Sequence, residues 1–571
     1  MTRSNIVGKF WQEHRLRFIL LIVFTFAYTL FLLIFPYILK DIIDGIRVHF
    51  TTAMLYRSIV MLGIIGLFRS ILGMLLPFTR GWTNEMFFRS QRTGLFSELL
   101  KKGHRFMNRY PVGDVLERAD ADLGELSWFA CSGIFRPVEG ILTIVVALFF
   151  LVKINWRLTV ICVMPMSLAI FTWMRYSPLI YKFYQRWREL MSQVHSFLQA
   201  SFAGIRIVKA YTMEARNSRG FSQLLQRRVE AAIKVIRTDA KVNVLFTSIE
   251  EIGILLILIF GGIYTIRSSL TIGEFIAFNA YILLLLNPMI NIGNFFVVKK
   301  RSDVQNQRLV EIAYYPAEII DQGRDVQGLF REITFDHVSF GYDDQAPLVL
   351  QDINLKIAAS NKIGIAGPVG SGKTTLLKLL IRIAEPTKGK VFINDKTDIK
   401  SLRLCDYRKL FGYTPQEPIL FSDTVSNNIT FGLDYSADKI NSVIKFARLG
   451  DFLNNPKGLD QLVGERGLKL SGGEKQRVAI GRTLIVDPKI FVFDDATSNL
   501  DAETEKVLFA NFNDTPDSTV IIVSHRLSVL AQCDYIYVLD QGRIVEQGSH
   551  ESLFGKKGLY WKLYRYQMAE Y

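Results

Sequence analysis

Cysteine is scarce in this chain of 571 residues. The only four are isolated from one another, at Cys131, Cys162, Cys405 and Cys533. None has the close spacing that zinc ligands need, and nothing marks a disulfide framework, so we expect small reduced core residues.

Acidic residues are also in deficit, with 53 Asp and Glu against 68 Lys and Arg. The resulting net charge of +15 resides largely in segments beside apolar runs, such as residues 175–241. This is typical of cytoplasmic flanks of membrane helices, so we expect membrane lipid and no nucleic acid as a partner.

Charge is almost missing from several long stretches of the first 300 residues, and half of the whole chain is hydrophobic. Six apolar runs are long enough to cross a hydrocarbon core of about 30 Å, at residues 18–39, 53–76, 131–152, 158–174, 243–266 and 275–298. The second and fourth connections between these runs are long and rich in Lys and Arg, which predicts that they are cytoplasmic. An even number of spans then places both ends of this region on the cytoplasmic side.

A few charged residues interrupt the apolar runs: Arg69, Arg136, Glu139, Glu250 and Glu251. Counting along the helices at 1.5 Å per residue places them at a comparable depth toward the inner leaflet. Charges inside a membrane are costly and usually face a cavity or each other. We expect a polar substrate cavity in which Arg69 or Arg136 pairs with a glutamate, although the same residues are also consistent with the ends of the bilayer.

After about residue 329 the pattern changes to alternating strands and helices with glycine turns. Residues 367–374 read Gly-Pro-Val-Gly-Ser-Gly-Lys-Thr between a predicted strand and a predicted helix, which is a phosphate-binding loop. Its backbone N–H groups cradle phosphates, Lys373 reaches the β- and γ-phosphates, and Thr374 holds Mg²⁺. The predicted ligands are therefore ATP and Mg²⁺. The nucleotide-binding residues expected here are Gly367, Gly370, Ser371, Gly372, Lys373, Thr374 and Thr375.

Three later motifs narrow the range of protein families to which the phosphate-binding loop could belong. Residues 470–474 read Leu-Ser-Gly-Gly-Glu, residues 491–494 read Phe-Val-Phe-Asp, and His525 follows a further strand. In this order they resemble the motifs of ATP-binding cassette (ABC) transporters, and the resemblance covers nearly the whole chain. Residues 463–467 resemble a segment particular to exporters of that family.

The resemblance implies a role for each motif residue. Tyr342 stacks on adenine, and Gln416 touches Mg²⁺ and the attacking water. Asp494 holds Mg²⁺ through water and His525 orients the water or touches the γ-phosphate. The signature residues Ser471, Gly472 and Gly473 face the γ-phosphate bound by a second chain, so two cassettes enclose two nucleotides.

One position departs from the family pattern. Hydrolysing members have a glutamate catalytic base after the Walker B aspartate, where this chain has Asp495. Aspartate is one methylene shorter, and a misplacement of about 1 Å can cost on the order of 10²-fold in rate. The preferred interpretation is a heterodimer in which this chain carries the impaired ATP site and its intact signature completes the partner's site. A slowly hydrolysing homodimer remains open.

The predicted fold class is therefore multi-domain, with an all-α six-helix transmembrane domain followed by an α/β P-loop ABC nucleotide-binding domain. The predicted boundaries are 1–300 for the membrane domain, 301–328 for a linker and 329–571 for the cassette. Within the long connections we expect short coupling helices near 110–117 and 211–218. We expect a multi-pass protein of the bacterial inner membrane with its cassette in the cytoplasm.

The predicted activity is ATP-driven export of a hydrophobic or amphipathic substrate by alternating access, as one half of a dimer with a second ABC half-transporter. The alternative is an ATP-gated channel or a regulatory subunit that binds ATP but hydrolyses it poorly.

Overall fold

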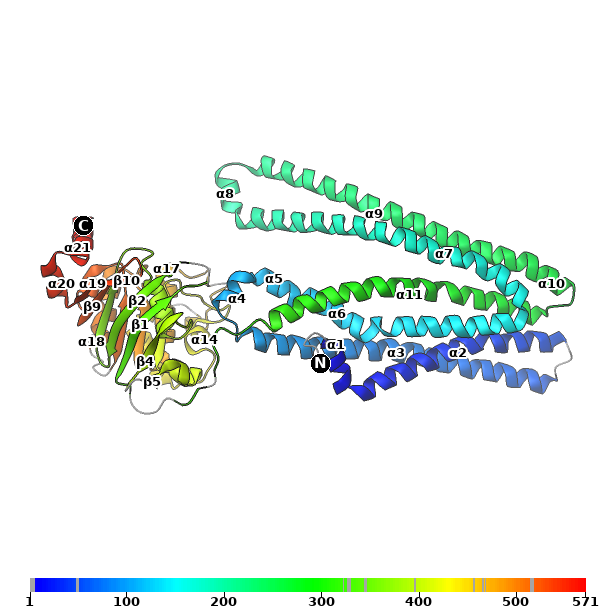
Figure 1. Ribbon diagram of the computed structural model, residues 1–571, viewed down its shortest axis with the longest axis horizontal. Coiled ribbons are helices and arrows are strands. Elements are labelled where there is room, and N and C mark those ends of the chain that lie inside the picture. The colour runs from blue at the N-terminus through cyan, green and yellow to red at the C-terminus, as the bar shows by residue number, and fades with distance from the viewer. Residues whose placement is uncertain are drawn as a thin grey trace. The chain divides into compact units, whose positions relative to one another are not determined.

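The computed structural model describes residues 6–47, 51–321, 323–325, 330–343, 347–394, 397–454, 457–464, 467, 469–513 and 518–570. The chain forms two compact units (Figure 1). One unit comprises Met1–Leu99 and Gly113–Tyr314, and the other comprises Leu100–Val112 and Tyr315–Tyr571.

The first unit is built of helices throughout its described residues. They are α1 (Ile6–Glu13), α2 (Arg15–Arg47), α3 (Thr52–Leu99), α5 (Val112–Glu117), α6 (Leu123–Trp128), α7 (Phe135–Ala203), α8 (Ile205–Ala210), α9 (Glu214–Leu256), α10 (Gly262–Ile266) and α11 (Ile272–Ala313). Short π-helical segments join α5 to α6, α6 to α7 and α9 to α10.

Four helical stretches among the described residues are long and apolar enough to cross a membrane: Arg15–Ile46, Thr52–Leu99, Val112–Met166 and Glu214–Ile266. They contain the first, second, third and fifth predicted spans. The fourth and sixth predicted runs are helical, within α7 and α11, but each includes side chains outside the described set. A shorter apolar helix at Ile272–Leu285 covers the first part of the sixth run.

The turn between the third and fourth runs lies inside α7, at Asn155. This residue has extended backbone angles (φ −159°, ψ 107°), so the helix axis breaks there. Its side-chain oxygen accepts a hydrogen bond from the N–H of Leu158 at 3.0 Å and so caps the helix that follows. A similar local signal starts α11, where Thr271 and Glu274 form a reciprocal capping box.

The short helices of the two long connections agree only partly with the sequence prediction. A short helix, α5, does lie within 110–117. In the second connection, however, the separate short helix is Ile205–Ala210, and the prediction of 211–218 was wrong. The chain turns at Thr212, whose φ is +51°, and the long helix α9 has already begun at Glu214.

The last helix of this unit also extends further than predicted, because α11 continues through 301–313 of the predicted linker. Ion pairs hold α5 and the turn after it against this extension. Arg118 pairs with Glu311 at 3.0 Å, and Arg308 pairs with Asp114 at 3.1 Å.

The second unit contains two sheets. The strands are β1 (Glu332–Phe340), β2 (Leu350–Ala358), β3 (Lys362–Ala366), β4 (Lys388–Ile393), β5 (Thr397–Asp398), β6 (Phe411–Thr414), β7 (Ile490–Asp494), β8 (Thr519–Val523), β9 (Tyr535–Asp540) and β10 (Arg543–Gly548). One sheet has the order β2-β1-β4-β5 and is antiparallel. The other has the order β10-β9-β3-β8-β7-β6, with only β10 antiparallel to its neighbour.

Helices surround the mostly parallel sheet, as the strand–helix alternation predicts. The helices of the second unit are α4 (His104–Arg109), which comes from the separate segment Leu100–Val112, and α12 (Lys373–Leu380), α13 (Leu404–Arg408), α14 (Val425–Thr430), α15 (Ala437–Phe446), α16 (Gly450–Leu453), α17 (Gly472–Ile485), α18 (Ala502–Asn513), α19 (Leu527–Leu530), α20 (His550–Lys556) and α21 (Leu559–Glu570). Strands β7 and β8 are buried along their whole length, which explains their nearly continuous hydrophobic sequences. The carboxyl ends of β3, β7 and β8 therefore meet at one edge of the sheet.

Candidate functional site

The phosphate loop lies at that edge, between β3 and α12. Gly367 and Gly372 have φ of +147° and +102°, in the region that favours glycine. A Cβ at Gly367 would lie 2.1 Å from the carbonyl oxygen of Leu539, so no other residue fits there without moving that backbone. The Ser371 hydroxyl is buried without a hydrogen-bond partner among the described residues. An anion in the loop would supply one.

The ammonium group of Lys373 folds back over this loop. Its Nζ donates hydrogen bonds to the carbonyl oxygens of Gly367 and Pro368, both at 2.8 Å. The side chain is buried, and burial lowers the pKa of Lys373, while the carboxylates of Asp494 and Asp495 oppose the shift. A cation that is held by carbonyl groups inside a glycine-rich loop is well placed to exchange those contacts for phosphate oxygens.

Thr374 and Asp494 converge beside the loop. The hydroxyl of Thr374 donates to Asp494 Oδ1 at 3.1 Å, and the hydroxyl of Tyr413 donates to Asp494 Oδ2 at 3.4 Å. Asp494 ends β7 and is only 1% exposed, and this burial raises its pKa. Adjacent hydroxyl and carboxylate oxygens are donors that fit Mg²⁺, which keeps several waters and takes few protein ligands. Among the described residues, no three or more His, Cys, Asp or Glu side chains lie together in a way that could hold a metal ion.

The next two motif residues are joined to each other. Asp495 follows β7 with a φ of +49°, and its backbone N–H donates to the carbonyl of Val523 at the end of β8. Its Oδ1 accepts a hydrogen bond from the backbone N–H of His525 at 3.3 Å. Gln567 of α21 donates to the His525 carbonyl and so holds the same segment from the other side. The structure thus brings Asp494, Asp495 and His525 to one edge of the sheet.

Tyr342 and Gln416 lie near this edge in different ways. The Tyr342 hydroxyl hydrogen-bonds the hydroxyl of Thr375 at 2.9 Å, so its ring is fixed beside the first turn of α12. Gln416 is exposed, two residues beyond β6. The contact that links this segment to Asp494 comes from Tyr413, to which sequence reasoning assigned no role.

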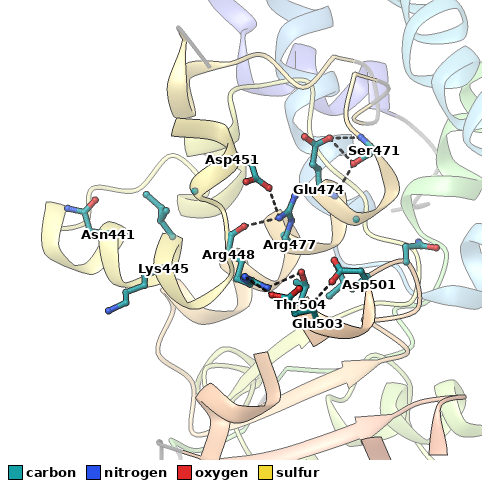
Figure 2. Close-up of a pocket in the computed structure, with 15 residues that line it drawn as sticks. Asn441, Lys445, Arg448, Asp451, Ser471, Glu474, Arg477, Asp501, Glu503 and Thr504 are labelled. Carbon is teal, nitrogen blue, oxygen red and sulfur yellow. Dashed lines mark hydrogen bonds and ion pairs between the residues drawn. The ribbon is translucent and has the colours of Figure 1, made fainter. Parts of the chain in front are cut away.

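The signature sequence starts α17 and faces a separate cavity of about 1000 Å³ (Figure 2). Ser471 is the N-cap of α17 and forms a capping box with Glu474. The cavity also takes Gly473, Asn499 and Asp501 in its lining. Gln476 accepts a hydrogen bond from the N–H of Asn499 at 3.0 Å, which fixes the segment after β7 against the signature helix.

Helix α17 begins at Gly472 and Gly473, of which the first is exposed and the second half-buried, and its N-terminus is suited to an anion. None of the residues that line the cavity belongs to the phosphate loop of this chain. The signature and the phosphate loop of this chain therefore lie in separate places.

The charges inside the apolar runs are arranged differently from the prediction. Glu139 pairs with Arg80, at 3.3 Å, and not with Arg69 or Arg136. Arg80 also donates to the Thr25 hydroxyl at 2.9 Å, while Arg136 lies over the ring of Trp128. Sequence reasoning missed Arg80, although it follows Arg69 by three helical turns and so lies on the same face of α3.

Glu250 is half-buried and Glu251 is exposed on α9. The described residues show no ion pair that joins either of them to Arg69 or Arg136. Their assignment to a substrate cavity stays a prediction.

These features define the class of protein: a helical membrane-spanning unit in the same chain as a nucleotide-binding cassette whose signature is exposed for a second chain. Comparisons with known proteins agree. The model of the ABC transporter transmembrane region matches residues 18–289, and the ABC transporter model matches residues 350–498.

Relatives and solved structures extend this likeness over the whole chain. An "ATP-dependent lipid A-core flippase" of Syntrophus aciditrophicus is 31% identical over 84% of this chain and 80% of its own length. A "Probable multidrug resistance ABC transporter ATP-binding/permease protein" of Bacillus subtilis is 30% identical over 98% of this chain and 97% of its own. A bacterial Atm1-family ABC exporter with ATP bound aligns with a TM-score of 0.81 at 27% identity, over 97% of this chain and 98% of that one.

The chain belongs to the ABC transporter family. It is a membrane-spanning transport ATPase of the exporter type, it binds ATP through its cassette, and proteins of this type act as dimers.

Proposed function

We propose that this chain is the half of a heterodimeric exporter that carries the weaker ATP site, and that its substrate is hydrophobic or amphipathic. The observation that carries the first part is Asp495. A carboxylate one methylene shorter than glutamate stands where the base is expected, and one of its oxygens bonds the backbone N–H of His525. The bond holds this carboxylate toward the His525 backbone, and the shorter side chain reaches less far toward an attacking water.

The residue roles that we propose are those that the family resemblance implies, and the geometry of the edge supports them. The phosphate-loop glycines, Ser371, Lys373 and Thr375 bind the phosphates, and Tyr342 stacks on adenine. Thr374, Gln416 and Asp494 hold Mg²⁺, with Asp494 acting through water. A Mg²⁺ ion held by these residues would neutralise the charge that develops on the phosphate. His525 orients water or touches the γ-phosphate, and Asp495 serves as a weak base.

The intact signature serves the partner. Ser471 and Gly472 are exposed and Gly473 is half-buried at the N-terminus of a 14-residue helix, with no phosphate-loop residue in the adjoining cavity. Such an N-terminus attracts phosphate. In a dimer it completes the second chain's ATP site, and that site carries most of the hydrolysis.

The substrate class is supported by the relatives and by the membrane unit. One relative is named as a lipid A-core flippase and another as a multidrug resistance transporter. Arg136 lies on Trp128 beside Phe295, where a cation and aromatic rings are together. This combination suits a molecule with a polar or anionic head and an apolar body. We place the protein in a bacterial inner membrane with its cassette in the cytoplasm.

Transport into inverted vesicles tests the proposal against the channel alternative. An exporter accumulates a fluorescent amphipathic probe against its gradient with MgATP and not with a non-hydrolysable analogue. A channel only lets the gradient collapse. Accumulation with the second half-transporter co-expressed, and little with this chain alone, supports the heterodimer.

A further inference from the structure

The ring of His104 lies on the ring of Tyr342. Their centroids are 4.7 Å apart and their planes are inclined by 33°. His104 begins α4, in the segment Leu100–Val112 that belongs to the second unit although it is far from the cassette in sequence. No motif of the sequence analysis includes it.

The segment is anchored to the chain that enters the cassette. Glu318 accepts hydrogen bonds from the backbone N–H groups of Arg105, at 2.5 Å, and Phe106, at 3.2 Å. The Phe106 side chain is 1% exposed and packs on the ring of Tyr315. The contacts of Arg105 and Phe106 therefore help to hold His104 at Tyr342, in addition to the contact between the two rings.

The contacts of Tyr342 leave one place for a nucleotide base. Thr375 and Lys378 bind its hydroxyl, at 2.9 and 3.4 Å. Phe340 meets its ring edge-on, with centroids 5.0 Å apart. His104 covers one face, and the ring is still partly exposed. An adenine that stacks on Tyr342 then uses the face opposite His104.

The imidazole also has an unused polar atom. His104 Nδ1 is buried and has no hydrogen-bond partner among the described residues. The charged groups that face the ring are Lys378 of α12 and Glu318. Burial lowers the pKa of His104, Lys378 lowers it further and Glu318 opposes this, so the ring is neutral near pH 7. A cationic ring would be repelled by Lys378, whose Nζ is 5.4 Å from the centre of the Tyr342 ring.

We propose that His104 is a positioning residue for the nucleotide base: the neutral ring backs Tyr342 while adenine stacks on its other face, and protonation of His104 weakens that support. This inference rests on the proposed nucleotide site at Tyr342. Binding of the base, and not only of the phosphates, then depends on the position of α4, because α4 carries the His104 ring that supports Tyr342.

The test measures MgADP binding to the full-length protein in lipid nanodiscs by calorimetry, at pH 7.5 and pH 5.5. At pH 7.5 we expect His104→Ala to weaken binding about twofold to tenfold, the range that the loss of one aromatic pair gives. His104→Phe keeps a flat ring and should restore the affinity. The wild type should bind less tightly at pH 5.5, and His104→Phe should lose most of that pH dependence.

Two controls separate this role from a general loss of structure. Magnesium pyrophosphate carries no base, so its affinity should be equal in the wild type and in His104→Ala. His337→Ala alters another histidine of the same unit, which is exposed and paired with Asp352, and should leave MgADP affinity unchanged.

Equal MgADP affinity in the wild type and His104→Ala would overturn the inference. So would an equal loss of pyrophosphate affinity, or an undiminished pH dependence in His104→Phe. If wild-type protein binds neither ligand, the proposed nucleotide site itself fails.

Discussion

Asp495 Oδ1 and the backbone N–H of His525 are joined by a hydrogen bond of 3.3 Å. The bond links Asp495, which directly follows β7, to His525, which lies two residues beyond the neighbouring strand β8, so the carboxylate takes part in shaping the loop that carries His525. A longer side chain at this position reaches further toward the phosphate loop and supports the His525 backbone less well. The single methylene difference therefore affects both the base and the support of its neighbour.

Asp495→Glu tests how much of the hydrolysis depends on that methylene. In a homodimer both sites gain reach, and ATP turnover should rise severalfold or more if chemistry limits the rate. In a heterodimer the partner already supplies one full site, and turnover should rise only modestly. The measurement is steady-state ATPase of the purified assembly. Asp495→Asn, which keeps the length but removes the negative charge, is the matched control and should not raise turnover.

The Arg80–Glu139 pair predicts a stability effect in the membrane unit. The side chains are 13% and 31% exposed, so breaking the pair leaves one mostly desolvated charge. We expect Arg80→Met to cost on the order of 2 kcal/mol, less than a fully buried pair costs. The double variant Arg80→Met/Glu139→Leu should recover part of this, as thermal unfolding in detergent would show. If the double variant loses as much stability as the two single variants lose together, or more, a direct pair is contradicted.

The sequence predicted the cassette better than the membrane charges, and the reason is physical. A phosphate loop needs glycines at positive φ next to a fixed lysine, so Gly367, Gly372 and Lys373 can be recognised from local sequence alone. The partner of Glu139 depends on how helices pack, which no local pattern encodes. Depth along the helix was a poor guide, because it favoured Arg69 and Arg136 over Arg80, which lies further along α3.

The same reasoning explains the other misses. The role of His104 at Tyr342 comes from a contact across more than two hundred positions, and periodicity within either segment carries no trace of it. The misplaced second short helix depended on one turn, at Thr212, whose positive φ no glycine or proline announces.

The two glutamates of α9 give a test of the substrate cavity. Replacing Glu250 and Glu251 by Gln removes charge with little change of shape. If they face the transported molecule, substrate-stimulated ATPase should change more than basal ATPase, and transport should change with it. Glu230→Gln, elsewhere on α9, serves as the control. Unchanged stimulation and transport would remove both residues from the cavity.

Cys405 reports the side of the membrane on which the cassette lies. It is exposed, whereas Cys533 is buried, and burial raises the pKa of Cys533 to about 12. Because the reactive species is the thiolate, a maleimide should label the cassette at Cys405 and not at Cys533. A membrane-impermeant maleimide should do so in inverted vesicles, which expose the cytoplasmic side, and not in intact cells. Cys405→Ser should abolish that label. Labelling of Cys405 in intact cells would contradict a cytoplasmic cassette.

The last prediction separates the two halves of the ATP site. In the proposed assembly, Lys373 of the phosphate loop serves the nucleotide bound by this chain, whereas Ser471, which caps the signature helix, serves the nucleotide of a partner. In a heterodimer, Lys373→Ala should weaken binding at the impaired site and leave substantial hydrolysis, since the partner's site is intact. In a homodimer it disables both sites, and almost no hydrolysis should remain.

Ser471→Ala should be damaging in either assembly, by about tenfold or more, because a donor to the transition-state phosphate is lost. Ser436→Ala removes the N-cap of α15, another exposed helix cap of the cassette, and controls for loss of helix stability. The readouts are ATP turnover and photolabelling of each chain by an azido-ATP. If this chain, purified alone, forms a stable dimer with brisk and cooperative ATPase, the heterodimer is wrong. If Lys373→Ala and Ser471→Ala lose activity equally in the two-chain assembly, the division of labour is wrong even though the dimer stands.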